Sequence, residues 1–151
     1  MKKSLLLFTI IAVTLGACSK EGIIRRKEDK LIGAWEFEKV TYKKDGALFR
    51  DNITSDYAND VIEFFPDYSA IYDDYSLRSV FDGEWSLIVD EDDVFDGSNS
   101  DLEFFVDAVF YDFLHREDFY VFGSIDRLNR NKLNLEGSDR FGRYNFKLRR
   151  L

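Results

Sequence analysis

Short runs in which apolar and polar residues alternate recur along most of this chain, and they constrain its fold more than any other feature. The clearest run, GEWSLIVDED, places Trp85, Leu87 and Val89 on one face. Successive side chains of a strand point to opposite faces, so this pattern is typical of a half-buried β-strand. Because aromatic residues also make up 17% of the chain and favour strands, the sequence predicts a mainly β domain.

The other strands are expected between turn residues that recur about every ten positions. The first run, LIGAWEFEKVTYKKDG, changes the parity of its apolar positions near Glu38 and Lys39, which predicts a β-bulge. ALFRD is a candidate return strand, and NITSDYAND is a polar connector with a short helical turn. Further strands are expected on both sides of a turn at Pro66-Asp67, at 119–125, around Leu133 and Leu135, and in RYNFKLRRL, where Tyr144, Phe146 and Leu148 share a face.

The segment 101–116 fits two patterns. Its apolar residues form a helical stripe, and Ser100 with Glu103 would make a capping box for such a helix. Alternation also fits, with only Asp112 out of pattern. The aromatic content and a possible turn near His115 favour the first arm of a long hairpin, and the helix stays an alternative.

The N-terminal residues are typical of a secretory signal. Lys2 and Lys3 precede an apolar run from Leu5 to Leu15 that carries no charge. This run is shorter than the roughly 20 residues that span a bilayer, and it matches the apolar region of a cleaved signal peptide. We expect residues 1–17 to be removed and the charged segment 18–30 to be a solvated tether.

Leu15-Gly16-Ala17-Cys18 resembles the lipobox of bacterial lipoproteins. The resemblance implies cleavage before Cys18 and a membrane anchor of acyl chains on this residue, and two or more chains give stable attachment. It also implies that Ser19 is compatible with delivery to the outer membrane, with the periplasmic or surface face left open. Since Cys18 is the only cysteine, an intramolecular disulfide is excluded.

Several short motifs in residues 31–151 resemble the lipocalin-like domains of small lipoproteins from Gram-negative bacteria. They are Gly33-Ala34-Trp35, VIEFFPDYSAIY, Gly83-Glu84-Trp85 and the paired final segments YVFGSIDRLNRNKLNLEG and YNFKLRRL. The resemblance implies an antiparallel lipocalin-like barrel or half-barrel of about eight strands, and it allows one short helix. It also implies an arginine near the last strand that lies across the first-strand tryptophan, for which Arg143 and Arg149 are both candidates.

Two functions follow from such a barrel. Its interior can bind a small apolar or amphiphilic ligand, with Trp35, Phe64 and Trp85 as candidate wall residues. Alternatively, the interior is packed and the barrel recruits a protein partner in the envelope. Without Lys2 and Lys3 the chain has 19 Lys and Arg residues against 29 Asp and Glu residues, so we expect no nucleic-acid partner.

Residues with catalytic or metal-binding chemistry are sparse. His115 is the only histidine, and no activated nucleophile or acid–base pair is recognisable, so we expect neither an enzyme nor a cofactor. In the acidic loop 90–101 and just after it, Asp92, Asp96 and Glu103 have EF-hand spacing and are weak calcium candidates. Val94 supplies no side-chain oxygen at the third position, so a solvated loop is the expectation.

Overall fold

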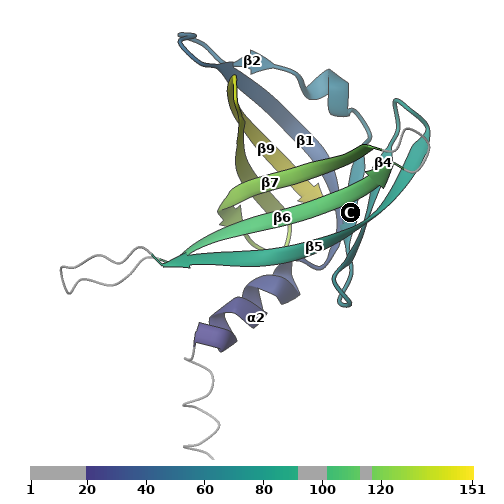
Figure 1. Ribbon diagram of the computed structural model, residues 1–151, viewed down its shortest axis with the longest axis vertical. Helices are drawn as coiled ribbons and strands as arrows, with labels where there is room; N and C mark the ends of the chain where they lie inside the picture. Colours follow the sequence, from purple (N-terminus) through teal and green to yellow (C-terminus); the bar gives the residue numbers. More distant parts are fainter. Residues whose placement is uncertain (1–19, 92–101, 113–116) are drawn as a thin grey trace, which may run out of the picture.

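Antiparallel strands make up most of the computed structural model, which describes residues 20–91, 102–112 and 117–151 (Figure 1). This confirms the mainly β prediction. In chain order the described elements are α2 (Lys20–Leu31), β1 (Gly33–Lys44), β2 (Asp51–Asn52), the 3-10 helix η1 (Thr54–Tyr57), β3 (Val61–Phe64), β4 (Ser69–Asp74), β5 (Ser79–Glu91), β6 (Leu102–Asp112), β7 (Glu117–Leu128), β8 (Lys132–Asp139) and β9 (Gly142–Arg150).

The strands form a closed barrel. From β3 to β9 each strand pairs with the next, β3 also pairs with β1, and the additional pairing of β1 with β9 joins the two ends of the sheet. Within the described residues, β1 and β3 to β9 thus give eight barrel strands, which confirms the expected antiparallel barrel and replaces the half-barrel alternative. The two-residue strand β2 pairs with β1 at Thr41 and Tyr42.

The predicted bulge in β1 is confirmed. Phe37 lies opposite Leu148 of β9, but Lys39 lies opposite Lys147, so Glu38 is the extra residue. Because the bulge shifts the alternation by one position, both Phe37 and Val40 are buried inside the barrel.

The return strand predicted at ALFRD is shorter than expected. Leu48 and Phe49 are 87% and 82% exposed in a loop, and pairing begins only at Asp51. Because these two side chains bury little apolar surface against the core, they do not stabilise pairing of this segment with the sheet. The helical turn expected in NITSDYAND is confirmed as η1.

Within the segment 101–116, the described residues 102–112 follow the strand pattern, not the helical one. β6 pairs with β5 on one side and with β7 on the other, and its buried residues alternate strictly, at positions 104, 106, 108 and 110. The turn near His115 lies outside the described residues.

The expected solvated tether is wrong for most of its length, because α2 is helical from Lys20 to Leu31 and packs across one end of the barrel (Figure 1). Leu31 is fully buried, and the ammonium group of Lys27 lies 4.7 Å from the centre of the Phe104 ring. Partial burial there lowers the pKa of Lys27. The predicted signal peptide and Cys18 lie outside the described residues.

None of the helices in the described segments is long and apolar enough to cross a bilayer.

Candidate functional site

The three aromatic residues predicted to contact a ligand lie in one packed, buried cluster. Trp35 is fully buried, and its indole N–H donates to the carbonyl oxygen of Leu31 at 2.7 Å. Phe64 and Trp85 meet edge to face with their ring centres 5.5 Å apart, and the indole N–H of Trp85 donates to the carbonyl of Phe65 at 2.9 Å. Both indole N–H groups are therefore already used in fixing the core.

Arg150 closes this end of the barrel. Its guanidinium lies 4.3 Å from the centre of the Trp35 ring, and its Nη1 and Nε donate to the carbonyls of Ile32 and Arg130, both at 2.6 Å. Nη2 donates to the carbonyl of Lys30, near the C-terminus of α2. A single side chain thus joins the end of the helix, the β7–β8 turn and the first-strand tryptophan.

This result corrects both arginine candidates for the contact with the first-strand tryptophan. Arg149 pairs with Glu36 on the outer surface, at 2.6 Å between Nη2 and Oε2, and Arg143 is exposed. Because Leu148 is buried inside the barrel, alternation along β9 turns Arg149 outward and Arg150 inward.

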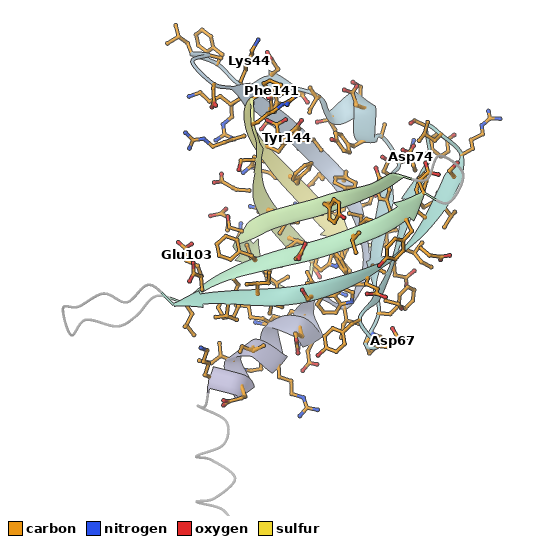
Figure 2. All side chains as sticks on the ribbon, in the orientation of Figure 1. Lys44, Asp67, Asp74, Glu103, Phe141 and Tyr144 are labelled. Carbon is orange, nitrogen blue, oxygen red and sulfur yellow. The ribbon has the colours of Figure 1, made fainter. Side chains whose placement is uncertain are left out.

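A pocket of about 500 Å³ lies toward the end of the barrel away from α2, near Tyr144 in Figure 2. Aromatic side chains dominate its wall, and Trp35, Phe64 and Trp85 are not part of it. It is lined by Phe37, Tyr57, Tyr72, Tyr120, Val121, Gly137, Ser138, Asp139, Tyr144 and Phe146.

Four elements bring the central rings of this wall together. The ring centre of Phe37 in β1 lies 5.2 Å from that of Tyr57 in η1, 6.0 Å from that of Phe146 in β9 and 6.4 Å from that of Tyr72 in β4. The hydroxyl of Thr54 holds η1 against β1, since it accepts from the Val40 amide at 2.9 Å and donates to the Val40 carbonyl at 3.3 Å. Contacts among these rings and the two Thr54 bonds therefore hold the wall together.

The pocket extends between two strands that separate. The β7–β8 ladder runs from Leu128 opposite Leu133 to Ser124 opposite Glu136 and ends there. Beyond it, β7 pairs only with β6 and β8 only with β9, and Figure 1 shows β7 diverging from the β9 hairpin. Tyr120 and Val121 line the pocket from one of these strands, and 137–139 line it from the other.

Asp139 is the only residue with a formal charge among the described residues that line this pocket. Its Oδ1 accepts from the amides of Phe141 and Gly142, both at 2.8 Å, while the hydroxyl of Tyr144 donates to Oδ2 at 3.3 Å. The bond from the Phe141 amide is the largest cause that holds the pKa of Asp139 below its usual value. This carboxylate is therefore ionised at neutral pH.

A second carboxylate lies behind the wall. Asp60 is 1% exposed, and its oxygens accept from the hydroxyl of Tyr72 at 2.5 Å and from the amide of Tyr75 at 3.0 Å. Burial raises the pKa of Asp60, and it also raises that of Tyr72, so the phenol stays protonated and keeps donating. Asp60 thereby fixes the orientation of one ring of the pocket.

The arrangement is suited to binding by apolar contact and hydrogen bonding. The segments that the structure describes contain no group of three or more His, Cys, Asp and Glu residues able to hold a metal ion. Of the calcium candidates, Glu103 lies exposed in β6 opposite Asp90, while Asp92 and Asp96 lie outside the described residues.

Sequence reasoning missed the residues of the pocket. Alternation correctly predicts a shared inward face for Tyr144 and Phe146, but it does not distinguish a ring beside a cavity from a ring in a filled core. Tyr57 lies in a polar connector and carries no periodic signal. Its position depends on the Thr54 bonds to a strand fourteen residues away in sequence.

Searches of family models, curated proteins and solved structures find no match to this chain.

Proposed function

We propose that this protein is a lipid-anchored cell-envelope protein whose barrel binds a small apolar or amphiphilic ligand in the aromatic pocket. The observation that carries the proposal is the pocket itself, because about 500 Å³ lies within the range of roughly 300–1,000 Å³ that is usual for ligand sites. The anchor rests on the lipobox sequence at Leu15–Cys18.

The lining supplies both kinds of contact that an amphiphile needs. Phe37 and Phe146 present apolar ring surface, and burial of that surface against a ligand contributes about 25 cal/mol per Å². Tyr57 and Tyr144 add hydroxyl groups that donate or accept hydrogen bonds. Because the rings already contact one another, little side-chain entropy remains to be lost when a ligand binds.

The anchor and the pocket lie at different ends of the fold under this proposal. Lys20, the first residue of α2, follows Cys18 by two positions, a reach of at most about 7 Å of extended chain. Since α2 packs on the end of the barrel opposite the pocket, acyl chains on Cys18 place the closed end nearest the membrane (Figure 1).

Ligand binding is tested with N-phenyl-1-naphthylamine, a neutral apolar dye whose fluorescence rises when it leaves water. We expect saturable binding to the protein and at least tenfold weaker binding to Val121→Trp, because the larger side chain fills the pocket. Val80→Trp is the matched control, since Val80 is 63% exposed on β5 and is not among the lining residues. Absence of binding, or equal binding to a folded Val121→Trp protein, would refute this function.

The anchor is tested by mass spectrometry of the protein isolated from a Gram-negative host. We expect a chain that begins at Cys18 and carries acyl groups, and a Cys18→Ser variant that is neither acylated nor retained in membranes. A chain that still begins at Met1, or an unmodified Cys18, would exclude lipid anchoring.

Recruitment of a protein partner is the second candidate function, and one observation favours it. Leu48, Phe49 and Phe141 are 87%, 82% and 53% exposed, and the amide of Asp45 donates to the Phe141 carbonyl at 2.8 Å, so these loops share one tip. A Leu48→Ser/Phe49→Ser protein should keep dye binding but lose any specific crosslink formed in cells through this tip. Unchanged crosslinking would remove the tip as a partner site.

A further inference from the structure

We infer that the aromatic pocket selects organic cations, meaning ligands with an apolar body and an ammonium group, over fatty carboxylates. This inference rests on the proposed function, because it names the ligand class of the same site. Three observations carry it: the ring content of the wall, the sign of its charge and the positions of the nearby arginines.

Six of the ten lining residues are aromatic, namely Phe37, Tyr57, Tyr72, Tyr120, Tyr144 and Phe146. An aromatic face is electron-rich and attracts a cation within about 6 Å of the ring centre, with a gain of about 0.5–2 kcal/mol. Several such faces around one cavity are the arrangement that recognises quaternary ammonium groups. The rings of Tyr144 and Phe146 are stacked 5.6 Å apart and present one continuous surface.

Charge in the wall has one sign. Asp139 is anionic, and no lysine, arginine or histidine is among the described residues that line the pocket. Oδ1 accepts from two backbone amides and from the Tyr42 hydroxyl, whereas the one described donor to Oδ2 is the Tyr144 hydroxyl at 3.3 Å, so Oδ2 keeps capacity for a ligand cation. The hydroxyls of Tyr42 and Tyr144 remain protonated, because desolvation and Asp139 raise their pKa.

The two arginines next to the β8–β9 turn, Arg140 and Arg143, lie outside the pocket lining. The guanidinium of Arg140 stacks on the Phe141 ring at 4.4 Å, outside the pocket lining. Arg143 is exposed and alternates with the inward-facing Tyr144 along β9. Neither arginine contributes to the wall that a ligand contacts.

The same pocket disfavours the head group of a fatty carboxylate. At the rim its charge faces Asp139, and the hydroxyl of Tyr72 already donates to the buried carboxyl of Asp60. Like charges repel, and a desolvated anion without a partner is costly to bury. Because Asp139 is solvent-exposed, its effect is moderate, and the rings supply the larger share of the preference.

The test compares three ligands with the same alkyl chain and different head groups: octyltrimethylammonium, 1-octanol and octanoate. Each displaces N-phenyl-1-naphthylamine from the full protein at neutral pH and low salt. We expect octyltrimethylammonium to bind at least tenfold more tightly than octanoate, with 1-octanol between them. Equal or tighter binding of octanoate would overturn the inference and leave ligand binding itself intact, whereas absence of dye binding would overturn the proposed function.

Two matched variants locate the charge effect. Asp139→Asn should reduce the ratio of ammonium to octanoate affinity several-fold and leave 1-octanol unchanged. Asp67→Asn is the control, because Asp67 is an exposed carboxylate that also accepts bonds within a turn, from the amide and hydroxyl of Ser69, but at the other end of the barrel. An Asp139→Asn protein with the original ratio would show that Asp139 takes no part in the selection.

Discussion

The two ends of this barrel are built from similar aromatic residues and differ in what those residues contact. At the closed end, the indole N–H of Trp35 and the guanidinium of Arg150 donate hydrogen bonds to backbone carbonyls. The helix α2 covers the strand ends there. At the pocket end, Phe37, Tyr57 and Phe146 contact one another around a cavity. The comparison teaches that aromatic content alone does not make a binding site, because the covering elements decide which rings stay accessible.

The strand ladders show the same difference. Near α2, β7 and β8 are paired through Leu128 and Leu133, whereas toward the pocket their pairing ends at Ser124. A barrel of about eight strands either is filled by side chains or holds one small ligand. In this barrel the packed half lies where β7 and β8 are paired, and the pocket lies where their pairing has ended.

The largest expected difference between the ends is in stability. Trp35→Ala should lower the free energy of unfolding by about 3–5 kcal/mol, because it removes a fully buried ring and opens a cavity. Phe146→Ala, at a half-buried ring beside existing space, should cost clearly less. Chemical denaturation of both variants measures the contrast, and equal losses would break the distinction between the two ends.

The second prediction compares adjacent arginines. Arg150→Ala should destabilise the fold by about 2 kcal/mol, because three carbonyls lose a charged donor and the C-terminus of α2 loses its cap. Arg149→Ala should cost less than about 1 kcal/mol, since its pair with Glu36 lies at the surface. Urea denaturation midpoints decide the point, and similar losses would mean that Arg150 does not hold the helix.

The third prediction concerns pH and the pocket end. Because burial raises the pKa of Asp60 above its usual 3.8, the folded state binds more protons than the unfolded state, and this group's contribution to stability falls as pH rises from about 3.8 through the raised value. Asp60→Asn removes that titration. The free energy of unfolding of this variant, measured relative to wild type, should therefore increase as the pH rises over this window.

Tyr72→Phe is the complementary variant for Asp60. In the wild type, the hydrogen bond from the Tyr72 hydroxyl lowers the pKa of Asp60. Removal of this hydroxyl should therefore raise the pKa of Asp60 further and extend the pH window to higher values. Denaturation curves at a series of pH values measure both variants. A pH dependence in Asp60→Asn equal to that of wild type would show that Asp60 does not titrate as its burial requires.

The smallest effects are expected in two turns with the same chemistry. Asp139 accepts the Phe141 and Gly142 amides at the pocket end, and Asp67 accepts the Ser69 amide at the closed end. Asp139→Ala and Asp67→Ala should speed hydrogen exchange of these amides without measurable change elsewhere. In the wild type both carboxyls have lowered pKa, so protection should be full above about 3.8 and decrease as pH falls through the folded values.

Much of the barrel could be predicted from local alternation. The bulge near Glu38 and the inward face of Tyr144, Phe146 and Leu148 follow from parity alone, because one residue of shift moves every side chain to the other face. The same rule, continued for one more step along β9, would have selected Arg150 in place of Arg143 or Arg149.

The helix α2 and the pocket could not be predicted in this way. The charges of 20–30 indicate a solvated segment, and the helix depends on Leu31 packing into the core and on Arg150, which is 119 residues away from Leu31 in sequence. The pocket depends on where the β7–β8 ladder ends, and no residue type at Ser124 or Glu136 marks that position. Both features result from tertiary contacts.

The pairing of β1 with β9 determines when the barrel can close during synthesis of the chain. Among the described strands, β1 with Trp35 is synthesised before the others and β9 with Leu148 and Arg150 after them, yet the barrel closes only when these two strands pair. Contacts between residues so distant in sequence slow folding, because the chain must lose much of its freedom before they form. The barrel therefore stays unclosed until β9 is available to pair with β1.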